Sequence, residues 1–268
     1  MNFMDTGCRD GDFGSERKHA PMQAVILAGG LSRRLGGVPK AGLTVGGITL
    51  LARTVEAALA LIDGQGPGRD ARPECEGPEC EDPGRATAPA VAVVGPAELL
   101  APWLGALAGR VVIARENPPY SGPAAGLAAG LAELAGDLPG ASGARPGAPA
   151  YTDGGHVLVL ACDMPRAGEL VRLLASGLEG ADPDTGVMAV DGGRRQPLAA
   201  IYPVGPLRAA VDAARASHRL SNASVFSLLA SVNTKECAVP PGLTADIDTW
   251  EDARMHGIAA KDQDPAPR

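Results

Sequence analysis

The sequence is poor in aromatic residues, in lysine and in long apolar stretches. It has three Phe, three Tyr and two Trp in 268 residues, too few for the base-stacking platforms of single-stranded nucleic-acid binders. A net charge of −7 also argues against a broad nucleic-acid-binding surface. No run of eighteen apolar residues occurs, and the first twenty residues are polar with no apolar core. We therefore expect neither a membrane span nor an export signal.

Cysteine is also scarce, with five residues at positions 8, 75, 80, 162 and 237. An odd, low number in a chain of this length is unlike a secreted disulfide scaffold. We therefore expect a reducing, cytoplasmic location. Apolar residues make up 45% of the chain, which is enough to bury a core and excludes disorder throughout.

Composition divides the chain into one folded domain with loose segments. Residues 1–20 and 261–268 read as unstructured tails, and the stretches 63–89 and 136–155 read as flexible insertions rich in Gly, Pro and small residues. Such segments bury too little apolar area to offset the entropy of ordering the chain. This leaves a single expected domain over residues 21–260.

Within that domain, short apolar runs alternate with helical patterns. We expect strands near 22–28, 90–94, 111–114, 157–161, 186–190 and 197–202. We expect helices near 49–62, 97–108, from Pro123 onward, 167–178, 206–216, 224–230 and 249–258. Strands that alternate with helices indicate a largely parallel sheet covered on both faces, with a ligand site at the carboxyl ends of the strands.

The segment richest in chemical information directly follows the first expected strand. Residues 27–40 read LAGGLSRRLGGVPK, and Lys40 is one of only four lysines. Glycines permit positive φ and let successive amide groups converge on an anion, while the cations add charge. Neither of the two common phosphate-loop patterns occurs. A solvated turn is the alternative, but the preceding strand and the following helix favour a phosphate site.

This loop resembles the signature of the nucleotidyltransferases that include molybdenum cofactor guanylyltransferase. Further blocks follow in the order seen in that family, at residues 116–126, 160–165, 195–198 and 246–249. The resemblance implies a three-layer α/β/α, Rossmann-like fold with a mostly parallel, mixed central sheet. It also implies Mg²⁺-dependent transfer of GMP from GTP to molybdopterin, with release of pyrophosphate and formation of the guanine dinucleotide cofactor.

The same resemblance assigns roles to individual residues. Catalysis would rest on Arg34, Lys40 and Asp163, and metal binding on Asp163 and Asp248. The nucleotide would contact Leu27, Ala28, Gly29, Gly30, Ser32, Arg33, Lys40, Asn117, Gly122 and Asp163. Fixed cations and amides at these positions would act electrostatically on the charge that develops around the α-phosphorus.

Two of the carboxylates have a purely structural alternative. Asp163, at the end of an expected strand, could cap the following helix instead of holding Mg²⁺. Its strand-end position favours the metal role. Asp248 and Glu251 have the spacing of a capping box, which would account for Asp248 without any ligand.

Asn117 stands where related guanylyltransferases usually carry Asp for nucleotide recognition, and it opens the turn sequence Asn-Pro-Pro. An amide both donates and accepts hydrogen bonds, whereas a carboxylate only accepts them from the guanine edge. A cytidylyltransferase or another nucleotidyltransferase acting on molybdopterin, a sugar phosphate or another small phosphorylated acceptor is therefore an alternative. A non-catalytic nucleotide- or cofactor-binding protein is another, and a molybdoenzyme or a cofactor-insertion protein is a candidate partner.

Overall fold

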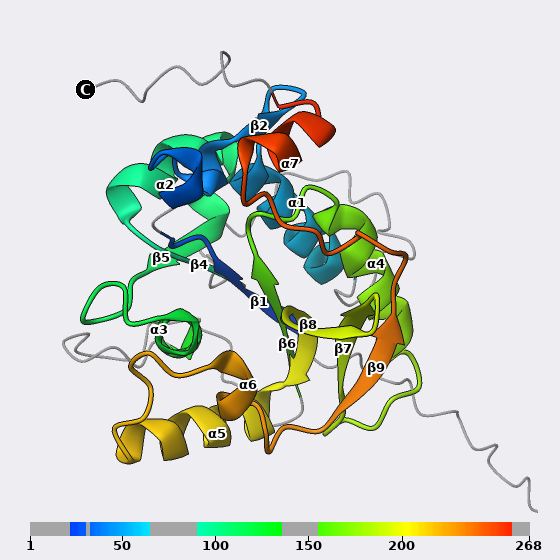
Figure 1. The fold of residues 1–268 in the computed structure, drawn as a ribbon. Coiled ribbons are helices and arrows are strands. Elements are labelled where there is room, and N and C mark those ends of the chain that lie inside the picture. The colour runs from blue at the N-terminus through cyan, green and yellow to red at the C-terminus, as the bar shows by residue number, and fades with distance from the viewer. Residues whose placement is uncertain (1–21, 31–32, 65–89, 136–154, 259–268) are drawn as a thin grey trace, which may run out of the picture.

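The computed structural model describes residues 22–30, 33–64, 90–135 and 155–258. Their centre is a seven-stranded sheet in the order β5-β4-β1-β6-β8-β7-β9 (Figure 1). Its strands are β1 (Met22–Leu27), β4 (Val91–Val94), β5 (Val111–Ala114), β6 (His156–Ala161), β7 (Gly186–Asp191), β8 (Arg194–Pro203) and β9 (Thr234–Ala238). β8 runs antiparallel to both of its neighbours, and the other pairings are parallel. The sheet is therefore mixed and mostly parallel, as expected.

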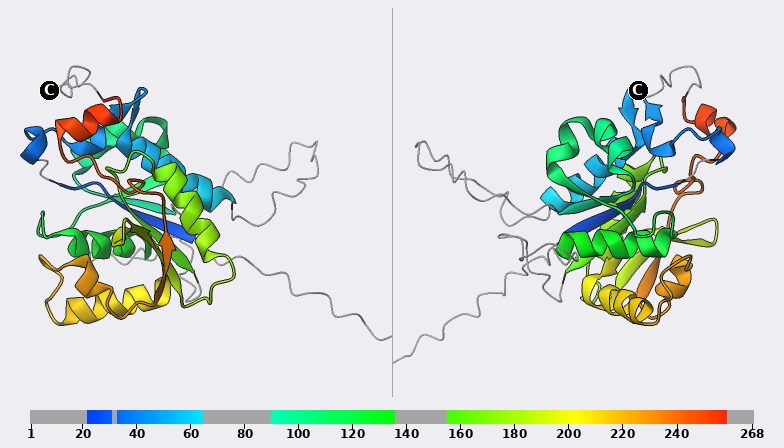
Figure 2. Two further views of the ribbon diagram at one scale, coloured as in Figure 1. Left: turned by 45° about the vertical axis from the view of Figure 1, so that its right-hand side comes forward. Right: turned by 90° about the vertical axis from the view of Figure 1, so that its left-hand side faces the viewer.

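Helices cover both faces of the sheet (Figure 2). One layer contains α1 (Leu50–Gly64), α2 (Ala97–Leu104) and α4 (Ala167–Leu178), and the other contains α3 (Pro123–Ala135), α5 (Val204–Ala216) and α6 (Val225–Leu228). The alternation of β1 explains the two cores, because Ala24 and Ile26 join one buried cluster while Val25 joins the other. This is the expected three-layer α/β/α architecture.

A third, smaller apolar cluster lies above the sheet edge. There α7 (Trp250–Met255) packs near the segment that follows β1, through Ala253, Leu35 and Ile247. A two-stranded sheet of β2 (Thr44–Val45) and β3 (Ile48–Thr49) adjoins this cluster through Val45. The cluster ties the C-terminal part of the described chain to the glycine-rich loop.

Several boundaries differ from the sequence-based expectations. Asp63 and Gly64 are the last residues of α1, so placing them in an unstructured insertion was wrong. Arg110 holds this last turn through an ion pair with Asp63 at 2.9 Å. The other residues of the expected tails and insertions, except the buried Gly155, lie outside the described residues.

The edge strand β9 was not expected. It is mostly exposed and carries Lys235 and Glu236, so it lacks the apolar alternation that identifies a half-buried strand. Backbone pairing with β7 forms it instead. Similarly, the expected helix over 97–108 ends at Leu104 and continues as a 3₁₀ segment, Gly105–Arg110.

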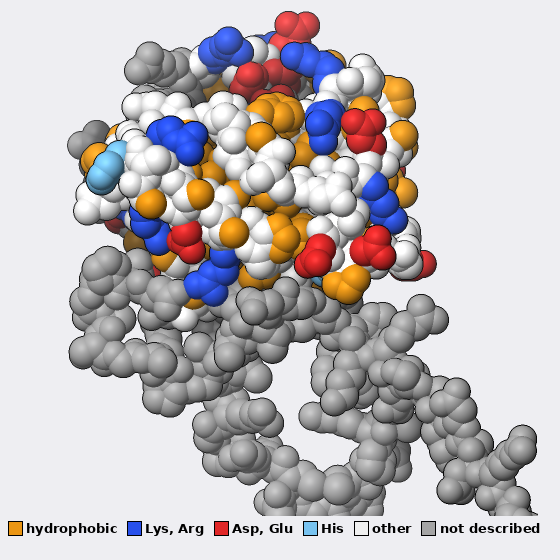
Figure 3. Space-filling model, turned by 90° about the horizontal axis from the view of Figure 1, so that it is seen from below, with side chains coloured by type: hydrophobic (Ala, Val, Ile, Leu, Met, Phe, Trp, Pro, Cys, Tyr) orange, Lys and Arg blue, Asp and Glu red, His pale blue; other side chains and the backbone are white. Residues whose placement is uncertain are grey.

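Acidic and basic side chains are interspersed on the lower face of the molecule, the side on which α5 lies in Figure 1 (Figure 3). Among the described residues, no helix is long and apolar enough to cross a bilayer.

The four strands β5, β4, β1 and β6 run parallel, so their carboxyl ends share one edge of the sheet. The candidate site lies at this edge.

Candidate active site

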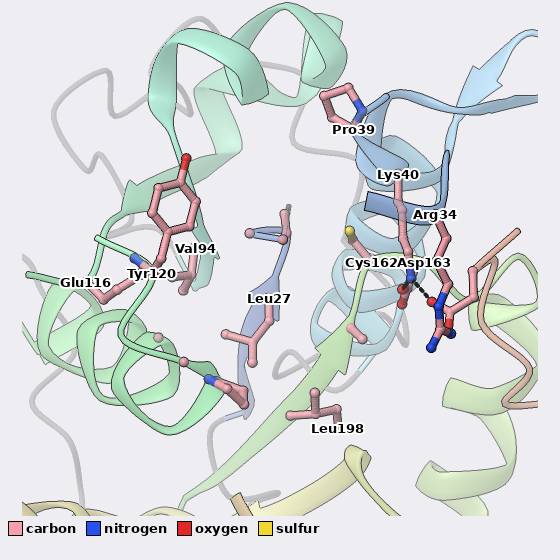
Figure 4. Close-up of a pocket in the computed structure, with 18 residues that line it drawn as sticks. Leu27, Arg34, Pro39, Lys40, Val94, Glu116, Tyr120, Cys162, Asp163 and Leu198 are labelled. Carbon is pink, nitrogen blue, oxygen red and sulfur yellow. Dashed lines mark hydrogen bonds and ion pairs between the residues drawn. The ribbon is translucent and has the colours of Figure 1, made fainter. Parts of the chain in front are cut away.

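A cleft of about 670 Å³ opens at the carboxyl edge of the parallel strands. Its lining combines the end of β1 (Leu27, Ala28, Gly29, Gly30), the next segment (Arg34, Pro39, Lys40), β4 (Val94), the β5–α3 region (Glu116, Tyr120, Gly122, Pro123, Gly126), β6 and its end (Ala161, Cys162, Asp163), and Leu198 and Asp248. Figure 4 shows that Lys40, Arg34 and Asp163 gather on one side of Leu27, and Glu116 and Tyr120 on the other. The cleft therefore has a charged end, defined by Arg34, Lys40, Asp163 and Asp248, and a loop end, defined by residues 116–122.

The glycines of the first loop divide into two pairs with different roles. Gly36 and Gly37 have φ of 69° and 87°, backbone angles that residues with a side chain rarely adopt. These two glycines turn the chain toward Lys40. Gly29 and Gly30 line the cleft without positive φ. A Cβ placed on Gly30 would meet no described atom within 4 Å, so a ligand can approach the backbone there.

Lys40 is the centre of the charged end. Its ammonium group donates to Asp163 Oδ2 at 2.8 Å, and it makes a second, very close contact with Asp248 Oδ1. Partial burial would lower the pKa of Lys40, but attraction and hydrogen bonding from the two carboxylates raise it above its ordinary value. The lysine is therefore held as a cation, with a side chain only 19% exposed.

Arg34 joins the same group from the rim of the cleft. Its Nη1 lies 3.0 Å from Asp248 Oδ2, and its side chain is 74% exposed. An exposed guanidinium can turn toward a bound phosphate at small cost because its ion pair is already solvated.

Asp163 follows β6 and does not cap the next helix. α4 begins at Ala167, and Arg166 occupies its N-cap position, so the capping alternative for Asp163 is wrong. The Asp163 carboxylate faces Lys40, and its backbone carbonyl accepts from Ile247 at 3.2 Å.

Asp248 does not cap α7 either, although its spacing with Glu251 is typical of a capping box. The capping box of α7 lies one residue later, between Thr249 and Asp252. The alternative in which Asp248 forms a capping box with Glu251 was therefore wrong. Asp248 directs its carboxylate at Lys40 and Arg34 instead.

Asp246 was not chosen as a site residue from the sequence. The structure places one carboxylate oxygen of Asp246 within 4.8 Å of those of Asp163 and Asp248. Burial, together with repulsion from these two carboxylates, raises the pKa of Asp246. The sequence feature that could have identified Asp246 is its Asp-x-Asp spacing with Asp248, because side chains two positions apart lie on the same side of an extended chain. The three carboxylates form a set that could hold a divalent cation.

At the loop end, the cleft is lined by Glu116 and not by Asn117. Asn117 is exposed and is absent from the lining, whereas Glu116 contributes to it. Glu116 Oε1 accepts from the Tyr120 backbone N–H at 2.9 Å, which holds Tyr120 at a φ of 61°. Gly122 lies in the lining as expected.

Two of the expected nucleotide contacts cannot be placed. Ser32 lies outside the described residues, and only the backbone of Arg33 is described. Apart from Asn117, the expected site residues that can be placed all line the one cleft: Leu27, Ala28, Gly29, Gly30, Arg34, Lys40, Gly122, Asp163 and Asp248.

Comparison with known proteins adds an independent result. Residues 24–232 match the family described as MobA-like NTP transferase domain. A molybdenum cofactor guanylyltransferase of Rhizobium meliloti is 31% identical over 183 residues, which are 68% of this chain and 63% of that protein. One of Nitrobacter hamburgensis is 29% identical over 189 residues, 69% of this chain and 68% of that protein. The chain thus spans less than two thirds of the length of the first relative.

Among solved structures, a nucleotidyl transferase from Methanothermobacter thermautotroptrophicus has the same fold. Its TM-score is 0.55 at 20% sequence identity, and the match covers 88% of this chain and 96% of that one.

Proposed function

Because the chain belongs to the MobA-like NTP transferase domain family, we propose that it is a Mg²⁺-dependent nucleotidyltransferase. The proposed reaction transfers GMP from GTP to a molybdopterin cofactor and releases pyrophosphate. The two curated relatives carry the name molybdenum cofactor guanylyltransferase, which supports this choice of substrates. The free thiols of Cys162 and Cys237 fit the reducing cytoplasm in which we place the reaction.

One observation carries the proposal: Lys40, Asp163 and Asp248 meet at one end of a cleft. Asp163 and Asp248 follow Lys40 by 123 and 208 residues along the chain. A bound triphosphate requires cations and accessible backbone N–H groups, and its metal ion requires carboxylates. The cleft brings these groups together from distant segments.

The carboxylates fit Mg²⁺ because hard cations prefer oxygen ligands, and Asp163, Asp246 and Asp248 offer only these. Mg²⁺ bound there would neutralise part of the triphosphate charge. The triphosphate oxygens would compete with Asp163 and Asp248 for the ammonium group of Lys40, which frees the carboxylates for the cation.

The transfer itself needs no general base. An oxygen of the acceptor's terminal phosphate is already anionic, so it attacks the α-phosphorus directly. The new oxygen–phosphorus bond forms as the α–β bridging bond breaks, and pyrophosphate leaves with the bonding electrons. Lys40 and Arg34 stabilise the negative charge that develops on the phosphate oxygens.

The loop end supports guanine as the base. With the triphosphate at the charged end, the base would lie toward Glu116. A carboxylate can accept from both the N1–H and the N2–H₂ of guanine, and the hydrogen bond from Tyr120 uses only one of its acceptor sites.

Nucleotide binding with Mg²⁺ tests the base and distinguishes the cytidylyltransferase alternative. Thermal unfolding with GTP, CTP, UTP and ATP should show the largest stabilisation with GTP, about 2.7 kcal/mol at a concentration 100 times its dissociation constant. Greater stabilisation by CTP would replace guanine by cytosine in the proposal.

Pyrophosphate release on mixing GTP with molybdopterin tests the reaction. Asp163→Ala should abolish both turnover and its Mg²⁺ dependence. Asp212→Ala, which removes an exposed carboxylate on α5, should change neither. Tight GTP binding without turnover would favour a non-catalytic binding protein instead.

A further inference from the structure

The carboxylates Asp246 and Asp248 lie on an irregular connection. Between the end of β9 at Ala238 and the start of α7 at Trp250, the chain forms turns and irregular segments but no helix or strand. Asp163, which they must face, belongs to a different part of the chain. A connection of this kind keeps such an arrangement only if specific contacts hold it.

Asp191, the last residue of β7, supplies such contacts. Its Oδ1 accepts from the Gly242 backbone N–H at 3.0 Å. Its Oδ2 accepts from the Thr244 backbone N–H at 3.0 Å and from the Thr244 hydroxyl at 2.8 Å. Both oxygens of a single carboxylate are thus used on the connection, and the contacts end two residues before Asp246.

The charge state of Asp191 agrees with this use. Burial would raise the pKa of its carboxyl group, but the hydrogen bonds from Thr244 and Gly242 lower it below its usual value. The carboxylate is therefore ionised near neutral pH, and charged acceptors make the stronger hydrogen bonds.

The other side of the acidic pair has anchors of its own. Ile247 is fully buried, and its N–H donates to the Asp163 carbonyl at 3.2 Å. The capping box of Thr249 and Asp252 then fixes the start of α7. Asp246 and Asp248 thus lie between the Asp191 contacts upstream and the α7 contacts downstream.

We infer that Asp191 is a positioning residue, which holds the connection so that Asp246 and Asp248 face Asp163 and can bind the divalent cation together. Asp191 does not itself line the cleft. The inference rests on the proposed function, since it assumes that these carboxylates hold a metal ion.

Asp191→Asn is the direct test, read by binding of Mn²⁺ to the protein with GTP, using electron paramagnetic resonance. The amide nitrogen cannot accept a hydrogen bond, so contact with either Gly242 or Thr244 is lost. We expect Mn²⁺ affinity to fall about tenfold, the size expected for losing one hydrogen bond to a charged group. GTP affinity in EDTA should stay within about twofold, because Asp191 lies outside the lining.

Turnover gives a second readout. The Mg²⁺ concentration for half-maximal rate should rise about tenfold, while kcat at saturating Mg²⁺ stays within about threefold, because excess metal compensates for a weakened site. Thr244→Val removes only the hydroxyl donor and should give a smaller change in the same direction. It decides the question if Asp191→Asn fails to fold. Asp212→Asn, on α5, is the matched control.

Asp163→Asn separates the two hypotheses. If Mn²⁺ affinity falls in Asp163→Asn but is unchanged in Asp191→Asn and in Thr244→Val, the positioning role is overturned, even if these variants melt at a lower temperature. If Asp163→Asn leaves Mn²⁺ affinity unchanged, the metal site of the proposed function is wrong.

Discussion

The two ends of the cleft are built in different ways. At the charged end, Lys40, Asp163 and Asp248 come from distant segments and contact one another directly. At the loop end, one short stretch has two hydrogen bonds within itself, Tyr120 N–H to Glu116 at 2.9 Å and Ser121 Oγ to the Pro118 carbonyl at 2.6 Å. One backbone bond, from the Asn222 N–H to the Ser121 carbonyl at 2.7 Å, joins this stretch to a distant segment. Tyr120 is 57% exposed there.

This difference suggests a division of labour. Transition-state stabilisation depends on charges held in fixed positions, and ion pairs between distant segments hold them there. Recognition of a base requires a few hydrogen-bonding groups, and a surface loop can supply them and vary without disturbing the sheet. Changes at the charged end should therefore reduce turnover, and changes at the loop end should alter nucleotide selectivity.

The largest effect is expected for Lys40→Ala. Removing this cation should lower kcat roughly 10²- to 10³-fold, as for other preorganised charge stabilisers. Steady-state pyrophosphate release measures it. Lys235→Ala, at an exposed position on β9, should leave kcat unchanged. A loss below about threefold for Lys40→Ala would remove the proposed role of the charged end.

Gly30→Ala tests whether the nucleotide lies against the backbone between the two ends. No described atom lies within 4 Å of the added methyl group, so we expect the melting temperature to stay unchanged. A ligand in contact with this backbone would be displaced, and GTP affinity should fall about tenfold or more, a loss of about 1.4 kcal/mol. Gly109→Ala, where an added Cβ also meets no described atom within 4 Å, is the control. Unchanged GTP affinity would mean that the ligand does not approach Gly30.

Glu116→Gln should act on selectivity. Its amide group keeps an acceptor for the Tyr120 N–H but can no longer accept both guanine donors. We expect the ratio of kcat/KM for GTP over ATP to fall about tenfold, the effect of a lost hydrogen bond of about 1.4 kcal/mol. kcat with GTP should change little. Glu179→Gln, exposed just after α4, serves as the comparison. An equal loss of kcat for every nucleotide would contradict the division between the two ends.

The smallest effect should involve neither end. His156 is buried at the start of β6, with Nε2 3.4 Å from the Thr185 carbonyl. Burial lowers the pKa of its imidazole, and Thr185 and Asp184 offset this only in part. The folded protein thus favours the neutral imidazole of His156. The unfolded chain protonates this ring near a pH of about 6.5, so the contribution of His156 to the free energy of unfolding is complete above that pH and declines as the pH falls below it.

Urea unfolding at pH 7 and pH 5 measures this contribution. His156→Gln should lose less stability between the two pH values than the unchanged protein does, because Gln does not titrate. His218 is exposed at a φ of 54°, which Asn tolerates, so His218→Asn is a suitable control. An equal pH dependence in His156→Gln and the unchanged protein would show that His156 does not contribute.

Local patterns in the amino-acid sequence were enough to predict several features of the fold. Apolar runs such as 111–114 and the helical pattern of 167–178 coincide with β5 and α4. Their alternation implied the parallel strands, and the parallel strands implied a site at their carboxyl edge. The glycine-rich loop after β1 and Asp163 after β6 both line the cleft found there. These features follow from interactions between near neighbours in the chain, which a single sequence displays.

Which side chains contact one another became known from the folded chain and could not be predicted from local pattern. A shift of one position moves the capping role from Asp248 to Thr249, and the same small distance makes Glu116 and not Asn117 a lining residue. Asp246 lies in the acidic cluster beside Ile247, whose N–H donates to the distant Asp163 carbonyl. Asp191 ends β7, which pairs with β9, and its carboxylate accepts from Thr244 on the connection that follows β9. Such contacts result from closing loops between distant segments, and local sequence patterns carry little information about where those loops close.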